Sequence, residues 1–245
     1  MWPDTDTPSA STPPGTRAYA IGDVHGRLDL LDRLHLAIEE DAATAPESRK
    51  VLVHLGDYVD RGPDSAGVLD RLLEGALPGF EWIVLKGNHE DLMLRFLDDP
   101  GSGPLWMMNG GAETLRSYGF DVDRRDPGLD FRDLRDRFAA ALPAAHRDFL
   151  RSLSLTHREG DYLFVHAGIR PGVPLEQQVE EDLIWIRDEF LHCGQDHGYV
   201  VVHGHTPVAA PEVRFNRIGI DTGAVWSGVL TALAMAGGER RFLAA

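Results

Sequence analysis

Five short apolar runs in this chain each end in a glycine-flanked cluster of Asp, Asn or His, which are residue types that bind metal ions. Two carboxylates, one amide and three imidazoles stand out at these five positions. Such a mixed oxygen and nitrogen set suits manganese, iron or zinc better than calcium, which takes oxygen ligands only. The candidate ligands are Asp23, His25, Asp57, Asn88, His166 and His205.

The number of these ligands indicates two metal ions. A single catalytic zinc ion keeps an open position and uses fewer protein ligands than this set offers. The set suits two ions if one carboxylate bridges them. Pairs of ions about 3.5–4 Å apart are used by phosphatases and nucleases, where they lower the pKa of a water and clamp the attacking and leaving oxygens. Two divalent cations would also make the pocket locally positive in an acidic protein.

The elements that must position these side chains follow from the pattern of apolar residues. Each apolar run has the length and β-branched content of a buried strand, and the glycine allows a sharp turn at its end. The segments 27–40, 64–77 and 90–99 have the character of helices, through apolar residues at spacings of three and four or acids at the start. Strand–helix–strand alternation predicts parallel units, whose carboxyl ends meet at one edge of a sheet. We therefore expect the six side chains to converge.

The remaining segments divide the chain into a tail, a domain and an insertion. Residues 1–15 are rich in Pro, Ser and Thr and predict a disordered tail, before a single domain over 16–245. Residues 98–158 interrupt the strand pattern and predict a helical cap insertion, with two helices broken near Pro143. This insertion is either a structural cap or a wall over the metal site that sets substrate choice. After residue 206 the pattern suggests closing antiparallel strands.

Within the insertion, three large side chains are either its core or an exposed platform for substrate: Trp106, Met107 and Met108.

Composition excludes several classes of function. The chain has 245 residues, 24 Lys plus Arg and 39 Asp plus Glu, so its formal charge is −15. Such a surface argues against sequence-independent binding to nucleic acid and against anionic membranes. No apolar run approaches the roughly 20 residues that span a bilayer. The single cysteine, Cys193, excludes an internal disulfide framework, and without a secretory signal it fits a cytoplasmic protein.

The motifs together resemble a known family. GDVHG (22–26), GDYVDRG (56–62), GNHE (87–90), HAG (166–168) and GHT (204–206) follow one another as in the phosphoprotein phosphatase family of metallophosphoesterases, and look most like its short bacterial serine/threonine phosphatases. The resemblance implies a fold in the α/β class: a β-sandwich of mixed sheets flanked by helices, with the metals at one edge. It also implies direct attack on phosphorus by a metal-bridging hydroxide, without a phosphoenzyme.

Carried over residue by residue, the resemblance assigns the ligands to two sites. Asp23, His25 and a bridging Asp57 hold one divalent ion. Asp57, Asn88, His166 and His205 hold the other. Manganese is the expected metal, with iron and zinc as alternatives. His203 shares a loop with His205, and the family pattern selects the histidine in GHT.

The same resemblance assigns residues to the reaction. His89 is the proton donor to the leaving oxygen, and Asp60 orients its imidazole. Arg61 contacts the phosphoryl group, and Arg187 stands where short members have a second phosphate-binding arginine. Lys86 precedes GNHE, where many members carry arginine, and is a further substrate contact.

Three functions are compatible with these residues. The first is a phosphatase acting on phosphoserine or phosphothreonine in proteins, and the second is a dinucleoside polyphosphate hydrolase of the diadenosine tetraphosphate type. Symmetrical members of the second group tend to have alanine at the position of Asp60 and GNHD at 87–90, which favours the first. The third, a non-catalytic metal-binding scaffold, is disfavoured because no ligand or acid is missing. Small phosphoesters stay open as substrates, as does the oligomeric state. Asp221 is either a turn residue or a support behind the ligands.

Overall fold

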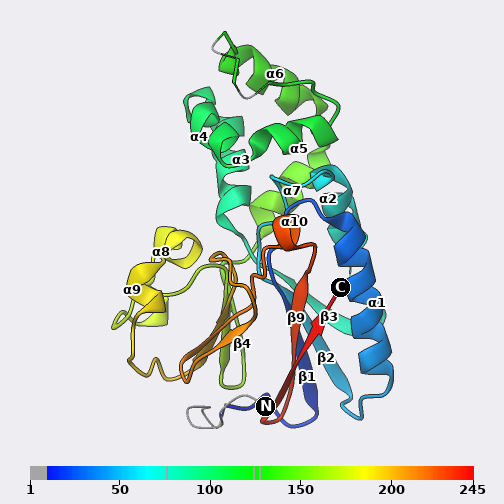
Figure 1. Ribbon diagram of the computed structural model, residues 1–245, viewed down its shortest axis with the longest axis vertical. Coiled ribbons are helices and arrows are strands. Elements are labelled where there is room, and N and C mark those ends of the chain that lie inside the picture. Colours follow the sequence, from blue (N-terminus) through cyan, green and yellow to red (C-terminus); the bar gives the residue numbers. More distant parts are fainter. Residues whose placement is uncertain (1–9, 76, 124, 127) are drawn as a thin grey trace.

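Two five-stranded mixed sheets pack face to face at the centre of the molecule (Figure 1). The computed structural model describes residues 10–75, 77–123, 125–126 and 128–245. In the first sheet the strand order is β10-β9-β1-β2-β3, and β1, β2 and β3 are parallel. Its strands are β1 (Thr16–Ile21), β2 (Arg49–His54), β3 (Phe80–Val84), β9 (Thr231–Ala236) and β10 (Glu239–Ala244).

The second sheet has the order β4-β5-β6-β8-β7, with β5, β6 and β8 parallel. The prediction of antiparallel strands after residue 206 is right for β9, which runs antiparallel to β1. For β8 it is right in part, because β8 runs antiparallel to β7 but parallel to β6, from which the chain crosses over. The strands are β4 (Thr156–Glu159), β5 (Tyr162–Val165), β6 (Val200–His203), β7 (Glu212–Val213) and β8 (Arg217–Gly219).

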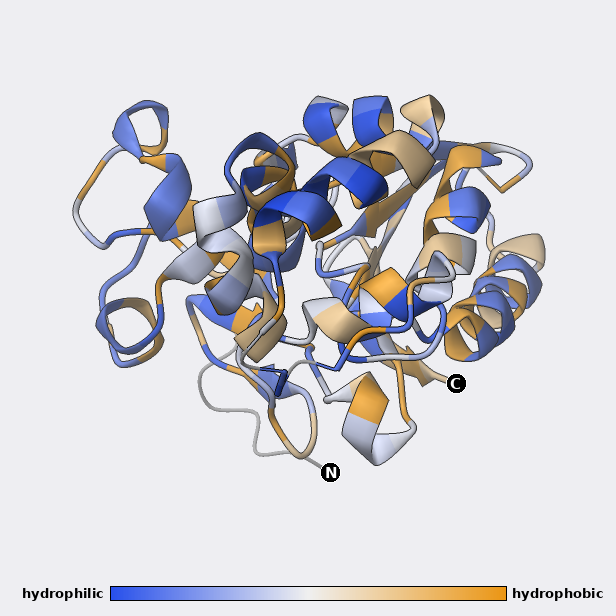
Figure 2. Cartoon of the chain, turned by 90° about the horizontal axis from the view of Figure 1, so that it is seen from above, coloured by the Kyte–Doolittle hydropathy of each residue, from blue (hydrophilic) through white to orange (hydrophobic). Residues whose placement is uncertain are grey.

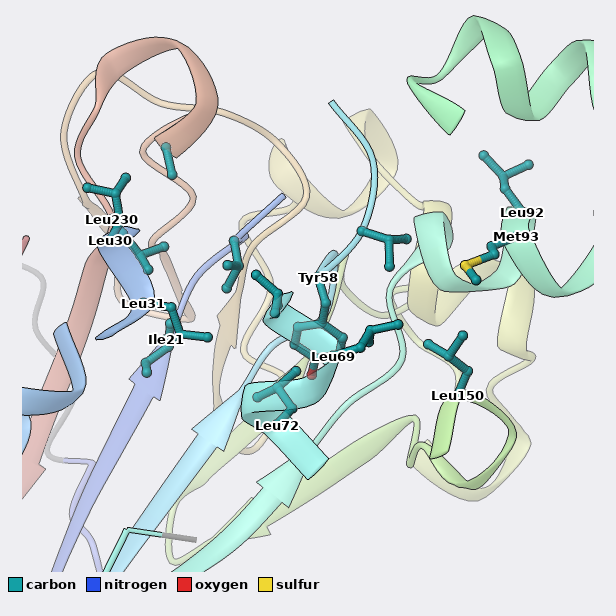
Figure 3. Close-up of a cluster of buried hydrophobic side chains, with 14 of the residues drawn as sticks. Ile21, Leu30, Leu31, Tyr58, Leu69, Leu72, Leu92, Met93, Leu150 and Leu230 are labelled. Atoms are coloured by element: carbon teal, nitrogen blue, oxygen red, sulfur yellow. The ribbon is translucent and has the colours of Figure 1, made fainter. Parts of the chain in front are cut away.

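Alternating side chains of β1 show how the layers are built. Ala18 and Ala20 face the core between the two sheets, where they meet Phe164 and other apolar residues of the second sheet. Tyr19 and Ile21 point the other way, into the core beneath the helices. Figure 3 shows part of this second core, where Ile21, Leu30 and Leu31 lie close together. Both cores confirm the predicted α/β class, a β-sandwich flanked by helices.

Three helices follow the parallel strands of the first sheet, as the sequence predicts: two connect β1 to β2 and β2 to β3, and the third leads from β3 into the insertion. They are α1 (Leu28–Ala43), α2 (Ser65–Leu73) and α3 (Asn88–Asp98). The helices carry hydrophobic and hydrophilic sides, as Figure 2 shows from above. The outer face of the second sheet packs against α8 (Glu180–Trp185) and α9 (Asp188–Leu191). Short elements complete the fold: η1 (Pro100–Ser102), η2 (Leu175–Gln177) and α10 (Ala224–Ser227).

The interrupted region is helical and extends from the end of α3, above the sheets in Figure 1. The predicted break at Pro143 separates its last two helices. Residues 156–158, at the end of the predicted insertion, instead begin β4. Trp106 and Met107 are buried, whereas Met108 is 80% exposed. The helices are α4 (Gly103–Met108), α5 (Gly111–Ser117), α6 (Phe131–Ala141) and α7 (Ala144–Ser152).

The chain is ordered before β1, in part of the segment predicted as a disordered tail. The Tyr162 hydroxyl donates to the carbonyl oxygen of Ala10 at 3.1 Å. The amide of Thr12 donates to the carbonyl of Gly237 at 3.1 Å. Residues 10–15 are therefore fastened to both sheets, which corrects the predicted boundary at residue 15, while 1–9 lie outside the described residues. Among the helices that the structure describes, none has the length and apolar character needed to cross a bilayer.

Candidate functional site

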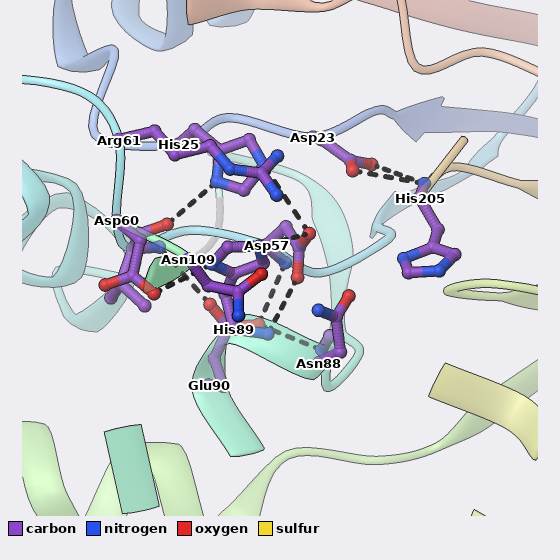
Figure 4. Close-up of polar contacts among 12 residues, drawn as sticks. Asp23, His25, Asp57, Asp60, Arg61, Asn88, His89, Glu90, Asn109 and His205 are labelled. Carbon is purple, nitrogen blue, oxygen red and sulfur yellow. Dashed lines mark hydrogen bonds and ion pairs between the residues drawn. The ribbon is translucent and has the colours of Figure 1, made fainter. Parts of the chain in front are cut away.

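The six predicted ligands come together at the carboxyl ends of the strands. Figure 4 shows five of them, Asp23, His25, Asp57, Asn88 and His205, around one space. Asn88 Oδ1 lies 2.9 Å from His166 Nε2. The Asp23 carboxylate accepts a hydrogen bond from the His205 amide at 3.1 Å, although the two residues are 182 positions apart. The predicted convergence is thus present.

Asp57 is shared by two groups of potential metal ligands. One group contains His25, Asp57 and His89, and the other Asp57, His166 and His205. Asp57 Oδ2 lies 3.5 Å from His25 Nε2, and its Oδ1 lies 3.3 Å from His166 Nε2. Each oxygen of one carboxylate therefore faces a different group, which is the arrangement required of a bridging ligand.

Backbone carbonyls orient two of the imidazoles toward this space. His25 Nδ1 lies 2.9 Å from the carbonyl of Val59, and His166 Nδ1 lies 3.0 Å from that of Leu55. An Nδ1–H that donates to a carbonyl leaves the Nε2 lone pair for a metal, a common second contact of histidine ligands. His166 Nε2 and Asn88 Oδ1 then face each other with lone pairs and repel. A cation bound to both atoms would remove this repulsion.

Other atoms of the site also fit a cation. His205 Nε2 is buried and has no hydrogen-bond partner in the described part of the chain. Burial lowers the pKa of both His166 and His205, so both imidazoles are neutral, the form that binds metals. Burial alone would raise the pKa of Asp57, but the positive charge that the imidazoles of His166, His89, His25 and His205 carry when protonated holds it below its usual range. The residues present therefore fit divalent metal ions.

Asp23 stands apart from the two compact groups. Burial raises its pKa well above the usual range, and the nearby carboxylates of Asp221 and Asp57 raise it further. Burial also raises the pKa of Asp221, to about 6. Three carboxyl groups this close repel one another unless a proton or a cation neutralises them. Asp221 thus lies behind Asp23, and its Oδ1 also accepts from the Gly223 amide at 2.9 Å, as in a turn.

The backbone of the site is strained. In the described part of the chain, five residues other than glycine have positive φ, from 44° at His25 to 71° at Asp60, and all five are predicted site residues. Such conformations cost energy and concentrate at functional sites. The five are His25, Asp57, Asp60, Arg61 and His205.

Two glycines of the motifs are needed because the backbone approaches a carboxylate. A Cβ atom on Gly87 would collide with the Asp57 side chain, and one on Gly204 with the Asp23 side chain. The glycines next to the ligands therefore make room for the ligands of neighbouring strands.

Glu90 connects the loop after β2 with the start of α3 through hydrogen bonds. The sequence motifs alone did not predict this role. Its buried carboxylate accepts hydrogen bonds from the amides of Tyr58 (2.7 Å), Asp57 (2.8 Å), Gly87 (2.9 Å) and Val59 (3.2 Å). The available signal was its place three residues after Gly87, where a helix capping residue accepts from the backbone. Glu90 thus fixes the position of Asp57 relative to α3.

His89 and Asp60 form a buried pair. His89 Nδ1 lies 2.7 Å from Asp60 Oδ2, and its Nε2 has no hydrogen-bond partner among the described residues. Asp60 also accepts from the Trp106 indole and the Thr114 hydroxyl, at 3.0 and 2.6 Å. Trp106 and Thr114 come from the helical insertion, and sequence spacing offered no signal for their contact with Asp60.

The charge of His89 is set by its neighbours. Burial lowers its pKa, but the carboxylates of Asp57 and Asp60 outweigh burial and raise the pKa above the ordinary value. A protonated imidazole cannot bind a metal, so the geometry of His89 fits a proton donor better than a third ligand of the first group.

Two arginines lie beside the ligands. Arg61 Nη1 lies 2.8 Å from His25 Nε2, and its guanidinium lies 5.3 Å from the ring centre of Trp226. Arg187 is exposed, and its Nη1 lies 3.4 Å from the hydroxyl of Thr206, the residue after His205. Both arginines therefore lie next to predicted ligands, and their contact with a phosphoryl group stays a prediction.

Lys86 and His203 lie elsewhere. The Lys86 ammonium contacts Asp91 at 2.8 Å and Glu180 at 2.6 Å, so it joins α3 to α8. Both carboxylates would compete with a phosphate for this charge, and the substrate contact of Lys86 stays a prediction. His203 is buried against Phe190, with 5.2 Å between ring centres, and belongs to neither ligand group. His205 is therefore the histidine of this loop that faces the site.

Comparison with known proteins gives two kinds of relative. The family model described as calcineurin-like phosphoesterase matches residues 16–227. The chain is 29% identical over 233 residues to the bis(5'-nucleosyl)-tetraphosphatase PrpE (asymmetrical) of Anoxybacillus flavithermus, covering 87% of this chain and 88% of the relative. It is also 29% identical over 222 residues to serine/threonine-protein phosphatase 1 of Salmonella typhimurium, with 87% and 89% covered.

Solved structures show the same fold. A cold-active protein tyrosine phosphatase superposes with a TM-score of 0.57 at 20% identity, covering 99% of this chain and 87% of that one. At this level of identity the likeness concerns the fold alone.

Proposed function

Because the chain belongs to the calcineurin-like phosphoesterase family and is a metal-dependent phosphoester hydrolase, we propose that it removes phosphate from phosphoserine and phosphothreonine in proteins. The family confirms the resemblance predicted from the motifs. The proposal is carried by one observation, the Asp57 carboxylate between two groups of imidazoles beside the His89–Asp60 pair.

We assign two divalent cations to the site, with manganese as the expected metal. Asp23, His25 and Asp57 would hold one ion, and Asp57, Asn88, His166 and His205 the other. When bound, the cations supply Lewis-acid activation of the phosphoryl group and of water. The mixed oxygen and nitrogen ligands support manganese, iron or zinc over calcium.

The protein's own side chains bind the phosphoryl group and move a proton. Arg61 and Arg187 hold the phosphoryl oxygens, since a guanidinium matches their charge and geometry. His89 donates a proton from Nε2 to the departing alkoxide oxygen, which is a poor leaving group without it. Asp60 keeps the His89 ring oriented through the Nδ1 contact of 2.7 Å.

A second candidate substrate is a dinucleoside polyphosphate, in which a phosphoanhydride is cleaved at the same site. A relative named bis(5'-nucleosyl)-tetraphosphatase supports this second candidate, and a relative named serine/threonine-protein phosphatase supports the first. Both are 29% identical to this chain. Asp60 is present in this chain and favours the phosphatase, because an alkoxide needs a proton more than a phosphate leaving group does.

One paired assay tests both candidates. Purified protein with Mn²⁺ is given a phosphoserine peptide and diadenosine tetraphosphate, and kcat/KM is measured for each. Preference for the peptide supports the phosphatase, and preference for the dinucleotide supports the alternative. The proposed function would be contradicted if the protein hydrolysed neither compound, or if Asp57→Asn were as active as the unaltered protein.

We also propose a cytoplasmic location, which the lone Cys193 supports because disulfides are rare in that compartment. Fractionation of cells that produce the protein would test this.

A further inference from the structure

A hollow of about 290 Å³ is lined on one side by Arg61, and the function proposed above uses none of its other lining residues. It is lined by α10 and by the turn that joins α4 to α5, both of which lie above the sheets in Figure 1. Its volume is just below the range of about 300–1,000 Å³ that small-molecule sites occupy. We call it the Trp226 hollow, and its lining residues are Arg61, Met108, Asn109, Gly110, Glu113, Val225 and Trp226.

The apolar part of the hollow is a large aromatic surface next to the phosphate-binding region. Trp226 is 65% exposed and Met108 is 80% exposed. The Arg61 guanidinium lies 5.3 Å from the Trp226 ring centre, while its Nη1 contacts His25 of the metal site at 2.8 Å. One arginine therefore connects the metal site with the Trp226 hollow. A substrate whose phosphate meets Arg61 can place a neighbouring group against Trp226.

The polar part of the hollow offers acceptors. Glu113 Oε2 is buried without a hydrogen-bond partner in the described part of the chain, while Oε1 is held by Arg116 at 3.0 Å. The Asn109 amide group donates to the Leu105 carbonyl at 2.9 Å, which leaves Oδ1 to accept. A ligand that satisfies Asn109 Oδ1 must bring an N–H donor, and rotation of the Glu113 side chain, which is 30% exposed, would offer its unpartnered oxygen as a second acceptor. The Glu113 carboxylate would repel a second phosphate, so an uncharged group fits better.

We propose that the Trp226 hollow binds the nucleobase of a nucleoside phosphate whose phosphate lies at the metal site. Trp226 stacks on the flat face of the base, and Glu113 accepts from an exocyclic amino group on its edge. An aliphatic peptide side chain would use neither the aromatic face nor the unpartnered carboxylate oxygen. The inference rests on the proposed function for the place of the phosphate, and it names nucleoside polyphosphates as the substrate class of the second candidate.

A pair of non-hydrolysable ligands tests this proposal by binding alone. α,β-Methylene-ADP and methylenebisphosphonate differ by the nucleoside, so the ratio of their Kd values measures the nucleoside contribution. Calorimetry with Mn²⁺ should show α,β-methylene-ADP binding about ten-fold or more tighter, the effect expected from stacking on one aromatic ring. A ratio near one in the unaltered protein would overturn the proposal.

Single-residue variants test which side chains produce the nucleoside contribution to binding. Trp226→Ala should bring the ratio close to one, and Trp226→Phe should retain most of it because a ring remains. Glu113→Gln should lower the ratio several-fold. Leu36→Ala, at an exposed position on α1, is the control and should leave it unchanged. An equal ratio in Trp226→Ala and the unaltered protein would place the nucleoside elsewhere and overturn the proposal.

The two proposals fail in different ways. A protein that hydrolyses the phosphoserine peptide but shows a ratio near one keeps the proposed function and loses the nucleobase site. A protein that shows the ratio but hydrolyses neither the peptide nor diadenosine tetraphosphate loses the proposed function and keeps the site.

Discussion

The indole nitrogen of Trp106 lies 3.0 Å from both carboxylate oxygens of Asp60. Trp106 is fully buried in the helical insertion, whereas Asp60 belongs to the loop after β2 and contacts His89. The core of the insertion therefore reaches the residue that orients the proposed proton donor. Folding of the insertion and orientation of the reaction site are coupled through this contact.

Replacing this tryptophan tests the coupling. Trp106→Phe keeps a buried ring but removes the N–H that Asp60 accepts from, which costs about 1–3 kcal/mol for a buried hydrogen bond. We expect a lower kcat with little change in KM, and a lower free energy of unfolding. Trp82→Phe is the matched control, because the buried indole nitrogen of Trp82 has no partner among the described residues. Equal losses in kcat in the two variants would contradict the role of the contact.

Replacing the proton donor should affect substrates unequally. His89→Asn removes the imidazole that protonates the leaving oxygen, and general acids contribute roughly 10²–10⁴-fold to the rate. We expect kcat for a phosphoserine peptide to fall by about this factor, and kcat for an aryl phosphate to fall much less, because a phenolate leaves without a proton. Steady-state kinetics with both substrates measures the difference. Equal losses would remove His89 from the acid role.

Two of the cationic side chains that the sequence predicts as substrate contacts should differ in importance. Arg187 lies beside the loop of His205, so Arg187→Gln should raise KM for phosphoesters about ten-fold or more through loss of a charged phosphate contact. Lys86→Gln should change KM little, because Asp91 and Glu180 already engage the ammonium. Its effect should appear in the unfolding free energy. A larger KM for Lys86→Gln than for Arg187→Gln would support the substrate contact predicted from sequence.

A buried histidine pair away from the site should make stability depend on pH. His35 and His54 have their Nε2 atoms 3.0 Å apart, and burial, helped by the charge of Arg71, lowers the pKa of His35 to about 3. The unfolded chain binds a proton near pH 6.5 and the folded chain does not, so stability is full above that pH and falls as pH decreases below it. For each such histidine, the free energy of unfolding falls by about 2 kcal/mol between pH 7 and pH 5.

Urea unfolding at both pH values, with EDTA present throughout, measures this loss. His35→Gln should lose about 2 kcal/mol less than the unaltered protein between pH 7 and pH 5. His192→Gln, at an exposed position, is the control. An identical pH dependence in all three proteins would show that His35 is not neutral in the folded state.

The convergence of the ligands could be predicted because it follows from local patterns. Apolar runs that end in Gly-Asp or Gly-Asn define strands and their carboxyl ends, and parallel strands bring those ends together. Asp57 and Asn88 are therefore near each other for the same reason that β2 and β3 are neighbours. The directions of α1, α2 and α3 follow from the same alternation.

Contacts that depend on packing between distant segments could not be predicted. Nothing local to Trp106 or Thr114 indicates that they meet Asp60, since that depends on how the insertion folds back on α3. The parallel pairing of β8 with β6 depends on the path of a loop. Lys86 is drawn to Glu180, 94 positions away, by a helix whose placement the sequence does not reveal.

Metal content tests the central claim most directly. Titration of the metal-free protein with Mn²⁺, followed by calorimetry, should give two ions per chain, and Asp57→Asn should lose tight binding at both positions because one carboxylate serves both. A single ion in the unaltered protein, or two tightly held ions in Asp57→Asn, would contradict a centre built around Asp57.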